Sequence, residues 1–285
     1  MENMKKISLL FLLVPLVACS TNNASSYKYE IDYSYGVFLG ADSSRINKIS
    51  KYDNPIIEIE EFEEDEISSL NNDGHHIYAY LSIGSLENYR DYYEQFKHLE
   101  FYEYENWPDE KWIDVSDSSW QQHLITEATK FKNLGAYGLF MDNFDVYYIA
   151  SEEYDGGEIF SNKIYNACID ILTSLHNIGL SLIINSGSTF LERLKEETKD
   201  TLLGYIDCYT QECVFSNIVD YDHDKFSKQD EETKEYYLSV INMMKNYSDV
   251  LLLEYTKDGE LIDEIVDFCI EESFHYYISK KVNLE

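Results

Sequence analysis

The chain has 285 residues, of which 44% are hydrophobic and 15% aromatic, and it carries a formal net charge of −32. That hydrophobic fraction is normal for a folded protein and excludes general disorder. The negative charge argues against nucleic acid and anionic membrane surfaces as partners, because both need clustered Lys and Arg, and it favours a cationic partner.

The first residues are typical of an export signal. Lys5 and Lys6 are followed by the mostly apolar stretch Ile7–Ala18, which is too short to span a bilayer. The segment before Cys19 resembles the bacterial lipoprotein signal box, which implies cleavage before Cys19 and lipid attachment to that residue. A plain signal peptide with an incidental cysteine is the alternative.

These features divide the chain into three parts. We predict a signal peptide at residues 1–18, a lipidated tether at 19–33 and one domain at 34–285. The domain is expected to be extracytoplasmic, monomeric and held at the bacterial cell membrane only through its lipid anchor.

The first half of the domain alternates short strands with helices. Its predicted elements are, in chain order, a strand at Tyr35–Leu39, a helix near Arg45–Lys51, a strand at Ile56–Ile59, a helix at Glu63–Leu70, a strand at Ile77–Ile83, an aromatic excursion over Tyr89–Trp112, a helix at Trp120–Phe131 and a strand at Tyr137–Met141. The helix that begins at Trp120 is predicted to end near Gly135, because glycine commonly terminates helices.

The second half continues the same alternation. It contains a helix at Ile164–Ile178, a strand at Leu180–Ile184, a helix at Phe190–Thr198, a strand at Tyr205–Tyr209, a helix at Glu232–Asn246, a strand at Val250–Leu253, a helix at Leu261–Ser273 and a strand at His275–Ile278. Eight strand-then-helix units predict an α/β protein with a single closed parallel (β/α)₈ barrel, the TIM barrel.

Polar residues stand at the ends of five consecutive predicted strands. In chain order they are Ser82 and Gly84, then Asp142, Asn143 and Asp145, then Asn185, then Gln211 and Glu212, and then Glu254. Barrel enzymes carry their chemistry at these strand ends, although a single strand end is often polar because it faces solvent. Two carboxylates facing one cavity, with amides nearby to hold hydroxyl groups, are typical of glycoside hydrolysis.

Four segments, in order, resemble the endo-α-1,4-polygalactosaminidase family, glycoside hydrolase family 114. They are YLSIGSLENYR (Tyr80–Arg90), NWPDEKWIDV (Asn106–Val115), GAYGLFMDNFDVY (Gly135–Tyr147) and QEC (Gln211–Cys213). The resemblance implies a (β/α)₈ barrel that cuts partly deacetylated polymers of α-1,4-linked galactosamine. It implies catalytic acids at the first Asp of the D-N-x-D segment and at the Glu closing the sixth strand, which are Asp142 and Glu212.

Within this pair we predict Asp142 as the nucleophile or base and Glu212 as the acid. An amide hydrogen bond from Asn143 is expected to help keep Asp142 ionised. The residues expected to desolvate Glu212 and raise its pKa are Tyr209, Val214 and Phe215. The predicted substrate-binding residues are Tyr80, Ser82, Asn143, Asp145, Asn185, Gln211, Glu254 and Trp107.

Several alternatives stay open at this point. Trp107, Trp112 and Tyr104 could stack on sugar rings or pack their loop onto the barrel. Cys208 and Cys213 could form a disulfide in an exported protein. The sequence has no motif for a phosphate loop, a nucleophile elbow or a zinc protease, so neither a cofactor nor a metal is predicted. The runner-up functions are a catalytically silent carbohydrate-binding barrel and a solute-capture lipoprotein.

Overall fold

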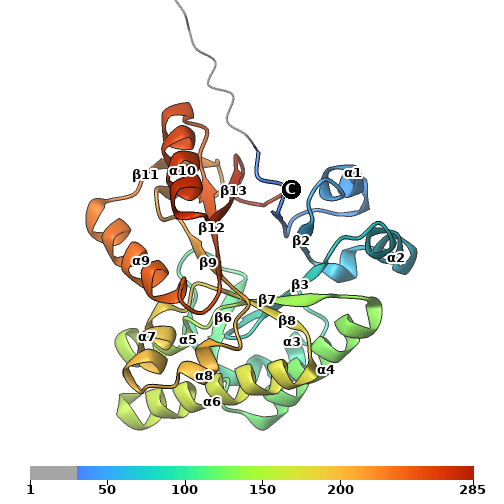
Figure 1. Cartoon of the computed structure of the whole chain (residues 1–285). Coiled ribbons are helices and arrows are strands. Elements are labelled where there is room, and N and C mark those ends of the chain that lie inside the picture. Colours follow the sequence, from blue (N-terminus) through green and yellow to red (C-terminus); the bar gives the residue numbers. More distant parts are fainter. Residues whose placement is uncertain (1–30) are drawn as a thin grey trace, which may run out of the picture.

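The computed structural model describes residues 31–285, and its core is a nearly closed barrel of parallel strands surrounded by helices (Figure 1). The strands follow one another around the barrel in the order β1 (Tyr35–Phe38), β2 (Asn54–Ile57), β3 (Tyr78–Ser82), β7 (Gly138–Asp142), β8 (Ser181–Asn185), β9 (Cys208–Glu212), β12 (Asp249–Tyr255) and β13 (His275–Ser279). The predicted (β/α)₈ fold is therefore confirmed. The predicted signal peptide, Cys19 and most of the predicted tether lie outside the described residues.

Side chains close the seam between the first strand and the last. The rings of Tyr35 and His275 are 5.0 Å apart, and those of Phe38 and Tyr277 are 5.4 Å apart. The neighbouring strands elsewhere in the barrel are joined by parallel ladders. Aromatic packing thus stabilises the one junction where the described strands show no ladder.

Helices on the outside of the barrel bury one apolar face each. They are α1 (Ile46–Ile49), α2 (Glu64–Asn72), α4 (Ser118–Leu134), α6 (Gly157–Ile178), α7 (Ser188–Glu196), α8 (Asp200–Leu203), α9 (Glu231–Met244) and α10 (Gly259–Glu272). In α4 the carboxylate of Asp117 accepts hydrogen bonds from the first free amides, and Gly135 ends the helix in the left-handed conformation. Among the described residues, no helix is long and apolar enough to cross a membrane.

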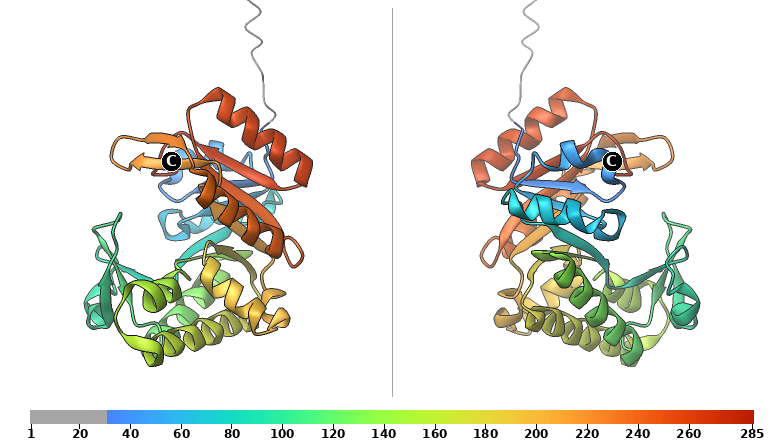
Figure 2. Two further views of the ribbon diagram at one scale, coloured as in Figure 1. Left: turned by 90° about the vertical axis from the view of Figure 1, so that its left-hand side faces the viewer. Right: turned by 90° about the vertical axis from the view of Figure 1, so that its right-hand side faces the viewer.

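Two insertions extend the barrel beyond its predicted elements. After β3 the chain forms a small antiparallel sheet, here the β4–β6 sheet, from β4 (Ser85–Glu87), β5 (Glu100–Glu103) and β6 (Glu110–Ile113). After β9 it forms a hairpin from β10 (Ser216–Asp220) and β11 (Lys225–Lys228). Both insertions project from the same side of the barrel (Figure 2).

The ends of the barrel strands differ from the prediction by one to three residues, and two of these differences affect the site. The sixth barrel strand, β9, begins three residues later than predicted, because Tyr205 and Ile206 still form turn hydrogen bonds to α8. The seventh, β12, runs past its predicted end at Leu253 and includes Glu254 and Tyr255. Side chains alternate between the two faces of a strand, so these shifts decide which of them reach the barrel mouth.

Candidate active site

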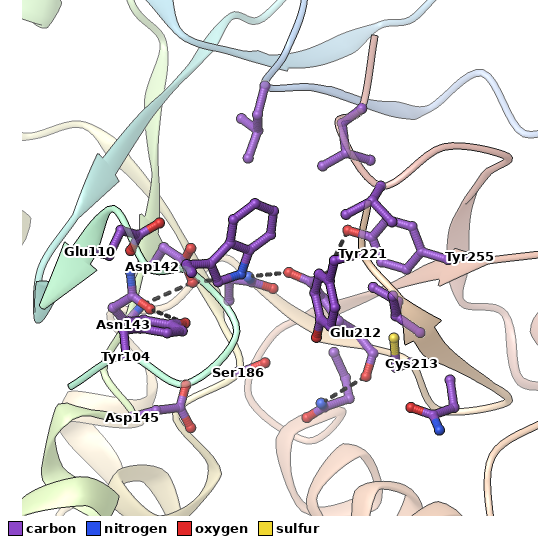
Figure 3. Close-up of a pocket in the computed structure, with 18 of the residues that line it drawn as sticks. Tyr104, Glu110, Asp142, Asn143, Asp145, Ser186, Glu212, Cys213, Tyr221 and Tyr255 are labelled. Carbon is purple, nitrogen blue, oxygen red and sulfur yellow. Dashed lines mark hydrogen bonds between the residues drawn. The ribbon is translucent and has the colours of Figure 1, made fainter. Parts of the chain in front are cut away.

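A cavity of about 1040 Å³ opens at the carboxyl ends of the barrel strands. Asp142, Asn185 and Glu212 line it, and they are the last residues of the three adjacent strands β7, β8 and β9. Figure 3 shows Asp142 and Glu212 projecting toward this cavity from different strands. The fold thus brings the two predicted catalytic carboxylates together.

A single side-chain amide joins these two carboxylates. Nδ2 of Asn185 donates to Oδ1 of Asp142 at 3.0 Å and to Oε1 of Glu212 at 2.7 Å. Both bonds use the two hydrogens of one NH₂ group, so the amide fixes the carboxylates relative to each other. The distance between the two accepting oxygens therefore cannot exceed the sum of these two hydrogen-bond lengths.

The backbone turns sharply just after Asp142, Asn185 and Glu212. Asn143, Ser186 and Cys213 all have left-handed conformations, with φ values of 68°, 56° and 56°. This conformation costs a non-glycine residue about 1–2 kcal/mol. Three such residues at adjacent strand ends are a concentration of strain typical of functional sites, and the turns leave the preceding side chains aimed into the cavity.

Asp142 is surrounded by hydrogen-bond donors yet strongly desolvated. Besides Asn185, it accepts from the backbone N–H of Asn143 at 2.9 Å and from the hydroxyl of Tyr80 at 3.2 Å. Burial, together with the charge of Glu212, raises the pKa of Asp142 to about 7, and the three donors oppose that rise. The expected amide bond from Asn143 comes from its backbone, whereas Asn185 supplies the side-chain amide.

Glu212 has fewer donors, and all of them are side chains. It accepts from Asn185 and, at 2.8 Å, from the hydroxyl of Tyr255. Burial raises the pKa of Glu212, as the sequence predicted, and its contacts are polar ones with Asn185 and Tyr255. The hydroxyl of Tyr209, predicted to lie near Glu212, instead donates to the side chain of Gln211.

The side chain of Asn143 is held by hydrogen bonds to Ser82 and Ser85. Its Nδ2 donates to the hydroxyl oxygens of Ser82 and Ser85 at 3.1 and 3.0 Å, and its Oδ1 accepts from the hydroxyl of Tyr104. Ser82 is buried and is not among the residues that line the cavity. Its predicted role in substrate binding is therefore corrected to support of Asn143.

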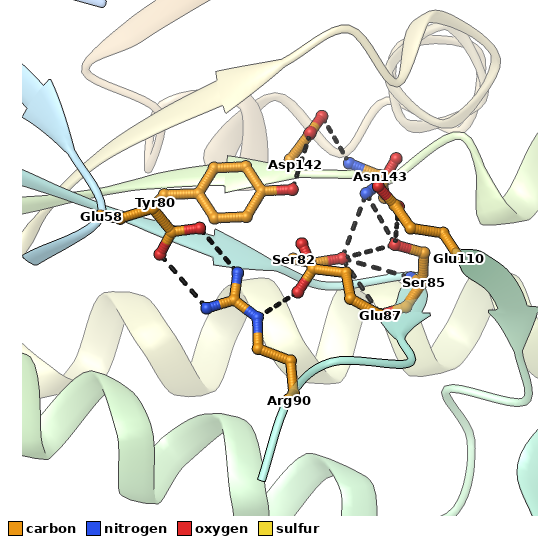
Figure 4. Close-up of polar contacts among 9 residues, drawn as sticks. All are labelled: Glu58, Tyr80, Ser82, Ser85, Glu87, Arg90, Glu110, Asp142 and Asn143. Carbon is orange, nitrogen blue, oxygen red and sulfur yellow. Dashed lines mark hydrogen bonds and ion pairs between the residues drawn. The ribbon is translucent and has the colours of Figure 1, made fainter. Parts of the chain in front are cut away.

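Three further carboxylates lie near Tyr80 and Asn143: Figure 4 shows Glu58 and Glu87 around Arg90, and Glu110 beside Asn143. Arg90 is paired with both Glu58, at 2.6 Å, and Glu87. Glu110 accepts from the hydroxyl of Ser85 at 2.8 Å, and burial and the charge of Glu87 raise the pKa of Glu110 to about 8. The guanidinium of Arg90 therefore pairs with two carboxylates, whereas the carboxyl group of Glu110 accepts a hydrogen bond from the neutral hydroxyl of Ser85.

Asp145 also lies in the cavity wall. Its Oδ2 accepts from the backbone N–H of Gly187 at 3.1 Å. Burial and the charge of Asp142 raise the pKa of Asp145 to about 7. Asp145 is thus a third carboxyl group in the same polar site as the pair.

Glu254 does not reach the cavity. Its carboxylate accepts from the backbone N–H groups of Phe215 and Ser216, at 3.0 and 2.9 Å, and from the hydroxyl of Ser216. Because β12 continues to Tyr255, Tyr255 reaches the site and Glu254 faces the segment after β9. The predicted substrate-binding role of Glu254 is corrected to anchoring of this segment.

Replacement of Glu254 by Ala is expected to destabilise the fold by about 3 kcal/mol, because buried donors lose their acceptor. Urea unfolding followed by far-ultraviolet circular dichroism measures this free energy of unfolding. Glu254→Gln, which keeps an acceptor oxygen, is expected to lose less. Equal stability of wild type and Glu254→Ala would contradict the anchoring role.

The remaining predicted residues have mixed positions. Tyr80, Gln211 and Trp107 line the cavity, and Gln211 also donates from Nε2 to the backbone oxygen of Glu212 at 3.1 Å. Trp112 is buried and stacks on Tyr104 at 4.4 Å, so these two pack the insertion, whereas Trp107 is 41% exposed. Cys208 and Cys213 are free thiols.

The sequence reasoning missed several residues of the site. Glu87, Arg90 and Glu110 fall within the segments that resemble the family. They were not predicted as site residues, because none of them stands at the end of a barrel strand. Tyr255 was missed because the strand that carries it was predicted too short. Within residues 31–285, no group of three His, Cys, Asp or Glu side chains is arranged to hold a metal ion.

Comparison with known proteins places this geometry in context. The model of glycoside-hydrolase family GH114 matches residues 18–283. The glycoside hydrolase domain of PelA from Pseudomonas aeruginosa superposes with a TM-score of 0.73 and 17% identity, over 88% of this chain and 96% of that one. Ega3 of Aspergillus fumigatus, solved with galactosamine, superposes with a TM-score of 0.64 and 17% identity, over 91% and 95%. These likenesses show a shared fold.

A curated viral protein matches part of the chain. A putative F-box protein of Acanthamoeba polyphaga mimivirus is 24% identical over 152 residues, which make up 52% of this chain and 22% of that protein. The match therefore spans about a fifth of that relative's length.

Proposed function

This chain belongs to glycoside-hydrolase family GH114, and we propose that it cuts internal linkages in a polysaccharide of partly deacetylated, α-1,4-linked galactosamine. The observation that carries the proposal is the pair Asp142 and Glu212, held by one amide at the mouth of a barrel. This pair supplies the two carboxyl groups that glycoside hydrolysis requires.

The contacts support a division of roles within the pair. Asp142 accepts three hydrogen bonds, one of them from the backbone, and these favour its charged form. We assign it as the nucleophile that bonds to the anomeric carbon. Glu212 donates its proton to the glycosidic oxygen as that bond breaks. It then takes a proton from the water that releases the sugar from Asp142.

The shared amide also supports a stereochemical outcome. Retaining enzymes have carboxyl groups about 5–5.5 Å apart, and inverting enzymes about 6.5–9.5 Å, because the latter place a water between them. The bonds of 3.0 and 2.7 Å from Asn185 draw the two carboxylates toward the shorter spacing. We therefore propose retention of configuration, which proton NMR of the first-formed product would reveal.

The charge of the cavity supports a substrate that bears free amines. Eight acidic residues are among those that line it, and none of the lining residues is Lys, Arg or His; the acids are Glu58, Glu87, Asp109, Glu110, Asp142, Asp145, Glu212 and Glu232. Arg90 offsets part of the charge of Glu58 and Glu87, and the other six acids leave an excess of acidic groups where a sugar chain would bind. Such a cavity attracts protonated amines and repels a polyanion.

The direct test incubates the domain with acetylated and deacetylated polysaccharides and measures new reducing ends. We expect release from partly deacetylated α-1,4-galactosamine polymers and none from polyanionic chains. Binding of the galactosamine polymer without release of reducing ends would instead identify a silent carbohydrate-binding barrel.

Glu110→Gln is expected to lower kcat/KM on the deacetylated polymer by about tenfold, because a bound ammonium group favours the ionised form of Glu110, whereas glutamine offers only a neutral acceptor. The loss should be smaller on a more acetylated polymer and smaller at high salt. Glu103→Gln is the matched control, because Glu103 lies on the same β4–β6 sheet, pairs with Lys111 and is not among the residues lining the cavity. An equal loss on both polymers would contradict amine recognition by Glu110.

We also propose that the protein is exported and anchored by lipid on Cys19, in support of which Leu16-Val17-Ala18-Cys19 closes the apolar N-terminal stretch. Labelled palmitate is expected to enter the wild-type protein and to be lost in Cys19→Ala. Cys269→Ala, at a buried thiol, serves as the control. Equal labelling of wild type and Cys19→Ala would refute the anchor.

A further inference from the structure

We propose that Trp107 and Tyr221 form an aromatic clasp over the catalytic pair, which holds a bound polysaccharide chain through successive cuts. The inference rests on the proposed function, because it concerns the same cavity and the same substrate. It adds a way of binding the chain that the two carboxylates alone do not require.

The clasp is made by the tips of the two insertions. Trp107 lies in the loop between β5 and β6, and Tyr221 directly follows β10. Their ring centroids are 5.5 Å apart and the rings meet edge to face at 79°. Both residues line the cavity that contains Asp142 and Glu212, and Figure 3 shows Tyr221 among the side chains of this site. The insertions, which leave the barrel at different strands, thus contact each other through these two rings. Figure 2 shows both insertions on the same side of the barrel.

Each insertion is anchored to neighbouring segments within a few residues of its ring. On one side, Asn88 donates to Asp109 at 2.9 Å and Tyr104 donates to Asn143. On the other, Asp224 accepts from the backbone N–H of Val282 at 2.8 Å. Among the described residues, the tips are joined by the ring contact without a hydrogen bond or an ion pair between them. The two loops are therefore held in place, and the rings can part by rotation of the Trp107 and Tyr221 side chains.

Exposure separates Trp107 from the other tryptophans of the chain. Trp112 and Trp120 are 5% and 1% exposed, whereas Trp107 is 41% exposed. The packing of the β4–β6 sheet is already provided by Trp112 against Tyr104. Trp107 is thus a large ring that the insertion's own packing does not use. Its apolar face suits the C–H faces of a sugar ring.

An arm-to-arm contact above the reacting bond has a kinetic consequence. An internal segment of a polymer can enter only when the tips part, and it can dissociate sideways only when they part again. While the clasp is closed, the chain can still slide along the cavity. The number of cuts per encounter therefore depends on the lifetime of the closed clasp.

Product analysis tests this directly. Trp107→Ala and Tyr221→Ala are each expected to reduce the number of cuts per encounter by about threefold or more, because the chain dissociates sooner. This number is the ratio of short products to new reducing ends left on long chains. Turnover on oligomers too short to span the clasp should fall by a smaller factor than the number of cuts on the polymer, because such oligomers dissociate after each cut in the wild type as well. Tyr102→Ala, an exposed ring on the same insertion that is not among the residues lining the cavity, is the control.

A binding measurement keeps the clasp testable apart from catalysis. Because Trp107 is the exposed tryptophan, acrylamide quenching of fluorescence reports on it. We expect the deacetylated galactosamine polymer to protect it from quenching, and to protect it less in Tyr221→Ala. Failure of the wild type to release reducing ends would refute the proposed function alone. Unchanged product ratios in both variants, or no protection of Trp107 by the polymer, would refute the clasp.

Discussion

Asp142→Asn and Glu212→Gln are each expected to reduce turnover about a thousandfold or more, while the thermal midpoint stays close to that of the wild type. The loss follows because the first variant has no carboxylate to attack the anomeric carbon. The second has no proton to give to the leaving oxygen. The fold should tolerate both changes, since burial raises the pKa of each group and neither charge is favoured by the folded protein.

The pH dependence of the rate separates the two roles. With Asp142 as nucleophile and Glu212 as acid, the pair gives a bell-shaped profile whose two apparent pKa values belong to the coupled pair. Residual activity of Asp142→Asn should lose the acidic limb, and that of Glu212→Gln the alkaline limb. Asp109→Asn removes a cavity-lining carboxylate that bonds only Asn88, and it is the control. Near-wild-type rates in either pair variant would redirect attention to Asp145.

The barrel was predictable because its signals are local. Each strand is a short run of β-branched and aromatic residues between turn signals, and each main helix carries one apolar stripe, as Trp120, Leu124, Ala128 and Phe131 show in α4. The pair Asp142 and Glu212 was predictable for a related reason. Both residues lie in family-like segments and both end barrel strands.

The predictions of site residues were wrong where a shift of one residue along a strand changes which side chains face the cavity. Glu254 and Tyr255 are neighbours in β12, and their side chains point to opposite faces of the strand. The side chain of Tyr255 lines the cavity, and that of Glu254 does not. Asn143 and Asn185 were both placed in the site, but the sequence could not show which amide would reach the carboxylates. That depends on the left-handed turn at Asn143, which directs its side chain to Ser82 and Ser85.

The insertions were the least predictable part of the site. The β4–β6 sheet pairs strands that are separated by loops, and its contribution to the cavity depends on how it folds back over the barrel. Glu110 and Trp107 reach the mouth only through that packing, so no periodic pattern marks them. The contact between Trp107 and Tyr221 joins segments more than a hundred residues apart in the chain.

Asn185 is the residue whose importance the structure raises most. Its Nδ2 contacts both carboxylates, and each of these bonds lowers the pKa of the group that accepts it. Without the amide, two negative groups would face each other across the cavity with less to hold them apart or to stabilise their charge. Asn185 is thus a positioning residue that acts through the pair.

Asn185→Ala is therefore expected to lower kcat about a hundredfold and to move both limbs of the pH profile to higher pH by roughly one unit. The sign follows from the contacts: loss of a donor makes each carboxyl group hold its proton more tightly, so Asp142 ionises later and Glu212 stays protonated longer. Rates measured from pH 4 to 9 test this, with Asn217→Ala, another amide in the cavity wall, as the control. A purely structural role for Asn185 would lower the rate without moving the profile, and a stationary profile would refute the shared-amide mechanism.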